Sequence, residues 1–134
     1  MFIGDHLQNV DAKFRVNVPA GFRPELGQKF VVAKGFNCIA LYPLDEWEGF
    51  LRKIEERKML LFFAAGSKEC ELDTQGRVVI PPDLRQYLNL QKEIKVVGAL
   101  THVEIWNRDE WTAYYDDEMY SAKNIENTMK AGKV

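Results

Sequence analysis

The chain has 134 residues, of which 46% are hydrophobic and 28% charged, and its net charge is −2. This balance is ordinary for a globular protein with one compact domain or two small packed halves. No apolar run approaches the about 18 residues of a membrane-spanning helix, and the first residues do not resemble a signal peptide. We therefore expect a cytoplasmic protein with no membrane partner.

The distribution of charge is more informative than the total. Residues 13–34 carry five basic side chains and one acidic side chain, whereas residues 109–118 carry five acidic side chains and no basic one. A basic segment on a mildly acidic chain favours a localised surface that faces an anion. An uneven solvated surface would give the same pattern.

The alternation from Phe14 to Val18 predicts a half-buried strand. Its apolar side chains, Phe14 included, would face the core, with Lys13 and Arg15 together on the outer face. Asp11 begins the turn before this strand, because an aspartate side chain can accept hydrogen bonds from the backbone two residues on.

The rest of the first half predicts strands, a turn and a helix. These are a strand within residues 2–10, a short helical turn at 22–26, a hairpin of strands at 29–33 and 38–42, and a helix that opens at Pro43. Trp47 and Phe50 belong to the apolar stripe of that helix. Residues 59–65 are the most apolar run, and they indicate either a buried helix end between two halves or a contact between subunits.

The second half repeats this order. Residues 69–72 lead into the second motif, as Val10 leads into the first, and a strand is predicted at 77–80. A short helical turn at 81–85, a hairpin of strands at 94–97 and 102–106, and a helix that contains Trp111, Tyr114, Tyr115 and Met119 follow. Residues 121–134 predict a weak final helix or a frayed tail.

A nine-residue pattern at residues 11–19 recurs at residues 73–81, with Asp, Arg and Pro at its first, fifth and ninth positions. Further on, the correspondence continues at an offset of 64, where Trp47 matches Trp111. One hairpin with one small helix cannot close a core, but two such halves paired about a pseudo-two-fold axis can. We therefore predict an α+β fold of two repeats, residues 1–63 and 64–134, packed as one unit.

The duplicated D-x-x-x-R, followed four residues later by proline, resembles the swapped-hairpin β-barrel of AbrB-type proteins. Two copies on one chain of this length resemble the MraZ family of bacterial transcriptional regulators, and segments 41–47, 76–81 and 103–106 add to the likeness. The resemblance implies a duplicated AbrB-like barrel with flanking helices. It also implies a nucleoid-associated protein that binds short direct repeats in double-stranded DNA upstream of its own cell-division and cell-wall operon, and that forms ring-like homo-oligomers.

Carried onto this sequence, the resemblance implies that both motifs present arginines to DNA. The DNA-binding residues that we expect are Lys13, Arg15, Arg77, Asp11, Asp73, Gln75 and Arg23. Phe14 departs from the pattern, which usually has glycine or a small or polar residue there, and this raises the question of whether the first loop bends as the second does. Gln75 stands where the first copy has a lysine, so the second copy attracts phosphate less strongly.

Arginine on a rigid strand can contact guanine or phosphate through two parallel hydrogen bonds. The alternative for Arg15 and Arg77 is an ion pair with Asp11 and Asp73 within a surface hairpin, which would contribute little to stability. Arg23 and Arg85, which correspond between the two repeats, could touch phosphate or cap the short helix of each repeat at its C-terminal end, and we favour the structural role.

No pattern of catalytic residues competes with this interpretation. His6 and His102 have no metal-ligand spacing, no glycine-rich phosphate loop is present, and the adjacent carboxylates at 116–118 would point in different directions on a helix. We expect no enzymatic activity, no cofactor and no metal site. The alternative function is an antitoxin-like or structural barrel that binds protein and has little direct role at DNA.

Overall fold

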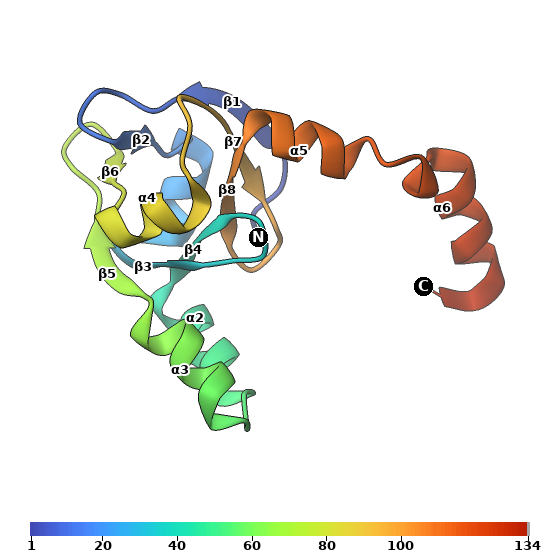
Figure 1. Cartoon of the computed structure of the whole chain (residues 1–134), viewed down its shortest axis with the longest axis horizontal. Coiled ribbons are helices and arrows are strands. Elements are labelled where there is room, and N and C mark those ends of the chain that lie inside the picture. Colours follow the sequence, from blue (N-terminus) through green and yellow to red (C-terminus); the bar gives the residue numbers. More distant parts are fainter. Residues whose placement is uncertain (134) are drawn as a thin grey trace.

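The computed structural model describes residues 1–133 and has a mixed α+β architecture (Figure 1). Its strands form a six-stranded antiparallel sheet, in the order β1-β7-β8-β4-β3-β5, and a two-stranded ribbon of β2 and β6. The strands are β1 (Asp5–Asn9), β2 (Arg15–Asn17), β3 (Lys29–Lys34), β4 (Ile39–Pro43), β5 (Lys68–Glu71), β6 (Arg77–Val79), β7 (Glu93–Gly98) and β8 (Val103–Asn107). The helices are α1 (Arg23–Leu26), α2 (Leu44–Arg52), α3 (Arg57–Ala65), α4 (Pro82–Leu88), α5 (Arg108–Tyr115) and α6 (Ala122–Thr128). Short helical segments lie at Ala20–Phe22, Glu118–Tyr120 and Met129–Lys133.

Strand pairing follows the sequence duplication. In the ribbon, Val16 lies opposite Val78, which is its own equivalent in the second half. At the centre of the sheet, Ala40 lies opposite its equivalent, Glu104. Each of these two ladders is therefore symmetric about a local two-fold axis.

The outer strands exchange between the two halves of the chain. β1 pairs with β7, and its equivalent β5 pairs with β3, which is the equivalent of β7. Each half therefore completes the sheet of the other. This is the swapped arrangement of an AbrB-like fold, as the resemblance implied.

The expected closed barrel is not formed by hydrogen bonds. Within residues 1–133 the ribbon and the sheet remain separate ladders. A physical reason lies in the ends of the ribbon strands, since β2 and β6 have three residues each and Pro19 and Pro81 follow shortly after them. Proline has no backbone N–H to donate, so it cannot extend a ladder.

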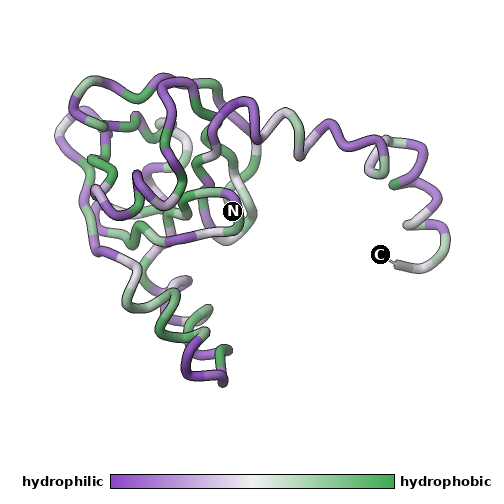
Figure 2. Tube along the Cα trace, in the orientation of Figure 1, coloured by the Kyte–Doolittle hydropathy of each residue, from purple (hydrophilic) through white to green (hydrophobic). Residues whose placement is uncertain are grey.

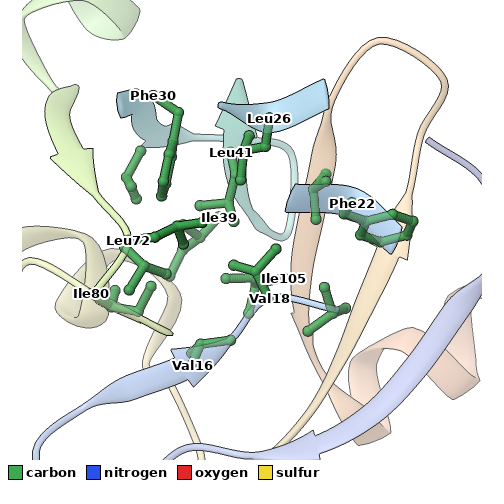
Figure 3. Packing of buried hydrophobic residues seen from close by; sticks show 14 of the residues in the cluster. Val16, Val18, Phe22, Leu26, Phe30, Ile39, Leu41, Leu72, Ile80 and Ile105 are labelled. Carbon is green, nitrogen blue, oxygen red and sulfur yellow. The ribbon is translucent and has the colours of Figure 1, made fainter. Parts of the chain in front are cut away.

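One apolar core joins the ribbon to the sheet. Val16 and Val18 from the region of β2 belong to the same buried cluster as Ile39 and Ile105 of the sheet (Figure 3). All four side chains are completely inaccessible to solvent. This packing fixes which face of the ribbon is turned outward.

α2 and α3 form a helical hairpin that projects from the sheet (Figure 1). Trp47 of α2 and Phe63 of α3 are buried together with Tyr42 of β4, as the apolar stripe of α2 predicted. In contrast, Met59, Leu61 and Phe62 are 56%, 45% and 43% exposed. The interpretation of residues 59–65 as a buried helix end is therefore wrong for most of α3, whose hydrophobic residues are visible in Figure 2.

α5 begins on the sheet and leads away from it (Figure 1). Trp111 and Tyr114 attach it to the sheet, because their rings lie 5.3 Å and 4.9 Å from that of Trp106. Met119 was predicted in the same helix as Trp111 but lies in the separate turn Glu118–Tyr120. The side chain of Asp117 accepts a hydrogen bond from the Met119 N–H, and such a cap starts a new helical segment instead of continuing the old one.

The boundary that we expected between residues 63 and 64 falls inside α3. The division of the chain at this position stays a prediction. Of the helices in residues 1–133, none combines the length and the apolar character that crossing a membrane requires.

Candidate nucleic-acid interface

The two repeated motifs fold into loops with matching hydrogen bonds. In the first loop, Oδ1 of Asp11 accepts from the backbone N–H groups of Lys13 and Arg15, both at 2.9 Å. In the second loop, Asp73 accepts the two equivalent bonds at the same distance. The aspartate is needed because its short carboxylate can reach backbone donors of its own loop. Both aspartates therefore organise their turns, as the sequence predicted for Asp11.

Each loop ends with a residue in the left-handed region, Phe14 with a φ of 59° and Gly76 with a φ of 77°. A turn followed by a left-handed residue is a common three-residue hairpin connection. Glycine adopts this conformation freely, whereas a residue with a side chain loses roughly 1–2 kcal/mol. The first loop nevertheless bends like the second. The prediction that Phe14 faces the core is wrong, because the positive φ takes its side chain out of the strand alternation and leaves it 44% exposed.

Two equivalent arginines cover these left-handed residues, each from the other half of the chain. The guanidinium carbon of Arg85 lies 3.7 Å from the ring centroid of Phe14, which is a cation–π contact. The guanidinium of Arg23 lies against Gly76, where a Cβ atom would come within 2.1 Å of it. Phe14 and Gly76 thus each accommodate a guanidinium group from the other half of the chain. Phe14 does so with the face of its ring, and Gly76 does so because it has no side chain.

Arg23 is also tied to the end of the ribbon. Its Nε donates to the Val18 carbonyl at 2.8 Å, and its Nη2 donates to Oδ1 of Asn17 at 3.1 Å. It therefore does not cap the C-terminal end of the short helix, because it is the first residue of α1. These contacts give Arg23 a structural role at the edge of the ribbon.

The outer face of the ribbon carries the two motif arginines. Arg15 lies opposite Val79 and Arg77 lies opposite Asn17, so the arginines are diagonal neighbours related by the local two-fold axis. The inner face is filled by buried valines that hold the ribbon on the core. The two arginines therefore share one rigid, outward-facing surface.

The side chain of each arginine is held at one atom. Nε of Arg15 donates to Oδ2 of Asp11 at 2.6 Å, and Nε of Arg77 donates to Oδ2 of Asp73 at 2.8 Å. Within residues 1–133, neither arginine makes a hydrogen bond through its Nη atoms, and both side chains are 27% exposed. The ion pair foreseen as an alternative is present, but it leaves both Nη groups of each guanidinium, with four N–H donors, for a ligand.

The hydrogen bond from the Arg15 backbone N–H holds the pKa of Asp11 below its ordinary value of 3.8, and the bond from Arg77 has the same effect on Asp73. A carboxyl group with a lower pKa in the folded than in the unfolded chain stabilises the fold above the unfolded value. That contribution disappears as the pH falls through the folded pKa.

We expect the double variant Asp11→Asn with Asp73→Asn to melt at a lower temperature than the wild type at about pH 7, because the charged acceptors of both loops are lost. The two proteins should converge only as the pH falls below the lowered pKa of the wild-type carboxyl groups, where these groups also lose their charge. Thermal unfolding followed by circular dichroism at several pH values measures this. Glu55→Gln, at an exposed carboxyl group outside the loops, is the control. A difference in melting temperature that stays constant with pH would contradict the role of these carboxylates.

The other expected site residues occupy different places. Lys13 and Gln75 are exposed in the two loops, so Lys13 does not share a strand face with Arg15 as predicted. Arg85 was considered together with its equivalent Arg23 for a phosphate contact or a helix cap, but it was not included among the expected DNA-binding residues. Trp47 and Trp106 are 6% and 3% exposed and are core residues, which agrees with the apolar stripe predicted for Trp47.

Comparisons with known proteins cover nearly the whole chain. Residues 1–60 and 63–131 match the sequence model of a family described as "MraZ protein, putative antitoxin-like". The "Transcriptional regulator MraZ" of Alkaliphilus metalliredigens is 43% identical over 139 aligned residues, and that of Caldicellulosiruptor saccharolyticus is 44% identical over 139, each covering 97% of both chains. The protein of the same name from Acetivibrio thermocellus is 41% identical over 138 residues and 96% of both chains. These matches confirm the resemblance drawn from the duplicated motif, and the chain belongs to the MraZ family of transcriptional regulators.

Proposed function

We propose that this chain regulates transcription by binding double-stranded DNA in a sequence-specific way through the outer face of the β2–β6 ribbon. The observation that carries the proposal is the diagonal pair of arginines on that face, each fixed at Nε and open at its Nη atoms. A two-stranded ribbon fits the DNA major groove, and arginine recognises the O6 and N7 atoms of guanine. The two-fold relation of the arginines would let one ribbon contact bases on both sides of its axis.

The aspartates act through the arginines and not on DNA directly. Asp11 and Asp73 orient the guanidinium groups, and a carboxylate that faced DNA alone would be repelled by the phosphates. Lys13, exposed in the first loop, is suited to a phosphate contact, while Gln75 can donate a hydrogen bond at the equivalent place without adding charge. Arg23, at the ribbon edge, holds Asn17 and adds positive charge to the surface.

One chain offers few cationic contacts, so we propose that it acts as a ring-like homo-oligomer on DNA with several short direct repeats. The names of the relatives support a role in transcription, and the resemblance supports repeats upstream of the chain's own cell-division and cell-wall operon. Footprinting on the DNA upstream of its own gene tests this directly. Protection of regularly spaced short boxes is the expected result.

Lys13→Ala should weaken binding to all DNA sequences by a similar factor, because a phosphate contact carries no sequence information. The slope of log affinity against log salt concentration should become shallower by about 0.9 for each phosphate that the variant no longer neutralises. Fluorescence anisotropy with an operator box and a scrambled box at several salt concentrations measures both effects. Lys92→Ala removes an exposed lysine outside the loops and should leave affinity and slope unchanged.

An unchanged slope for Lys13→Ala would remove this lysine from the interface. Failure of the wild-type protein to bind the upstream DNA or any other duplex would favour the alternative function, an antitoxin-like barrel that binds a protein partner. The description of the matching family, which contains the words antitoxin-like, is the observation that keeps this alternative open.

A further inference from the structure

Two exposed apolar side chains flank Arg15 at one end of the β2–β6 ribbon. Phe14 precedes Arg15 in the first loop and is 44% exposed, and Val79 lies opposite Arg15 in the ladder and is 56% exposed. Val79 shares the outer face with Arg15, because Val16 and Val78 fill the inner face. The ribbon and its loops lie at the end of the molecule opposite α6 (Figure 1). Arg15 is therefore placed between two apolar groups on an open surface.

The other end of the ribbon carries its arginine in different surroundings. Gly76 precedes Arg77 in the second loop, and Asn17 lies opposite Arg77 in the ladder. Asn17 accepts a hydrogen bond from Nη2 of Arg23 at 3.1 Å, so a polar side chain is held beside this arginine. The backbone of the ribbon is thus related by a local two-fold axis, whereas the chemical groups beside its two arginines differ.

The position of Phe14 is fixed by three contacts. Its backbone N–H donates to the Asp11 carbonyl at 3.0 Å, and its own carbonyl accepts from the Ile80 N–H at 2.9 Å. The guanidinium of Arg85 lies 3.7 Å from the ring centroid. The backbone of Phe14 has a positive φ, and glycine occupies the equivalent place in the second loop without this strain. A strained residue that the surrounding structure holds in this way points to a function of its side chain.

The chemistry of the major groove identifies a ligand for this apolar pair. Thymine is the base that presents a methyl group there, and proteins recognise it by apolar contact, for which phenylalanine is suited. Phosphates instead attract basic and hydrogen-bonding groups, so a phosphate contact would not make use of Phe14 or Val79. Apolar groups on both sides of an arginine that recognises guanine fit a thymine in the neighbouring base pair.

We propose that Phe14 and Val79 determine sequence specificity by contacting the methyl group of a thymine next to the guanine that Arg15 binds. Arg85 is a positioning residue, because its guanidinium covers one face of the Phe14 ring and leaves the rest of the ring for the base. The inference rests on the proposed binding of DNA by the ribbon. It adds the identity of a base that one end of the ribbon selects and the residues that select it.

The test removes the methyl group and nothing else, because uracil differs from thymine only by that group. Each thymine of a one-box operator DNA is replaced in turn by uracil, and the affinity of the full chain is measured by fluorescence anisotropy. Replacement of the contacted thymine should weaken binding about fourfold, which is the factor expected for one buried methyl group. The effect should occur on one side of the box only, because Gly76 and Asn17 offer no apolar surface at the other end of the ribbon.

A double variant links this effect to the two side chains. Phe14→Gly with Val79→Asn gives the first end of the ribbon the residues that the second end already has, so the fold should be retained, and circular dichroism checks this. The variant should bind thymine and uracil boxes equally and still prefer the operator box to a scrambled box through its arginines. Ile3→Asn, at a 64% exposed apolar residue outside the ribbon and its loops, should keep the fourfold difference.

The positioning role of Arg85 has its own measurement. Arg85→Ala should reduce the ratio of thymine to uracil affinity, because the Phe14 ring loses the group that covers one of its faces. In the background of Phe14→Gly the same change should leave the ratio unaltered, since no ring remains to be positioned. A general weakening of DNA binding by Arg85→Ala with an unchanged ratio would exclude this role.

Several outcomes would overturn the inference while the proposed function stands. These are an operator box that contains no thymine, a wild type that binds every uracil box as tightly as the thymine box, and a folded double variant that keeps the fourfold difference. Failure of the proposed function gives a different result, in which the wild type shows no preference for operator over scrambled DNA. The comparison of operator with scrambled DNA therefore separates the two.

Discussion

Replacement of both ribbon arginines, Arg15→Ala with Arg77→Ala, should abolish the preference for operator DNA over scrambled DNA without unfolding the protein. A bidentate contact from arginine to guanine discriminates against the wrong base by about 1–3 kcal/mol. If the two contacts are independent, the double variant loses about 2–6 kcal/mol, which is roughly 30-fold in affinity at the lower limit. Anisotropy titrations with one operator box and one scrambled box give the preference directly.

Two controls separate charge from geometry. Arg15→Lys with Arg77→Lys keeps both charges but loses the planar fork, so it should retain binding to scrambled DNA while it loses the operator preference. Arg52→Ala removes an exposed arginine of α2, paired with Glu48 at 2.6 Å, and should change neither. A folded double alanine variant that still prefers its operator would disprove the assignment of these arginines.

The fold was largely predictable because the repeated motif at residues 11–19 and 73–81 makes the duplication recognisable in the sequence. The alternation of valines with polar residues placed β2 and β6 correctly, and the structure pairs them across a local two-fold axis at Val16 and Val78. One half of the chain has too few strands to close a core, so it must pair with strands of the other half. The swapped pairing of β1 with β7 follows from that requirement, although sequence alone gives no register.

The errors have local physical causes. Alternation predicted Phe14 inside, but a hairpin loop of this length needs a left-handed residue at that position, and Phe14 takes it. The apolar run of α3 was ambiguous, because burial within the chain and burial between chains give the same composition. The motif predicted a closed barrel, but it could not show whether hydrogen bonds close the barrel. Closure depends on ladder hydrogen bonds between the ribbon and the sheet, and the prolines after β2 and β6 do not provide them.

The site was predictable only in part. The Asp–Arg spacing anticipated the pairs of Asp11 with Arg15 and Asp73 with Arg77, because these bonds are local. The covering of Phe14 by Arg85 crosses from one half of the chain to the other. Contacts of that kind require the fold, so sequence could identify Arg85 only as the equivalent of Arg23.

The second large effect concerns how a chain of net charge −2 binds DNA at all. If each ribbon supplies only a few phosphate contacts, one box on one ribbon gives weak binding that falls steeply with salt. Ribbons held in one assembly make the second contact intramolecular, and affinity can rise by roughly 10²- to 10⁴-fold without any new kind of contact. We therefore expect DNA with two boxes at native spacing to bind far more tightly than DNA with one box.

The spacing of the boxes decides whether this gain is realised. Insertion of about 5 base pairs, half a helical turn, turns the second box to the opposite side of the duplex, where a rigid assembly cannot reach it. Insertion of about 10 base pairs, a full helical turn, returns the second box to the side of the duplex that faces the assembly. This insertion should recover part of the gain in affinity. Anisotropy with one-box, two-box, half-turn and full-turn DNA measures all four affinities. Equal affinities would contradict avidity, while a gain that survives the half-turn insertion would show that the assembly is flexible enough to follow the second box around the helix.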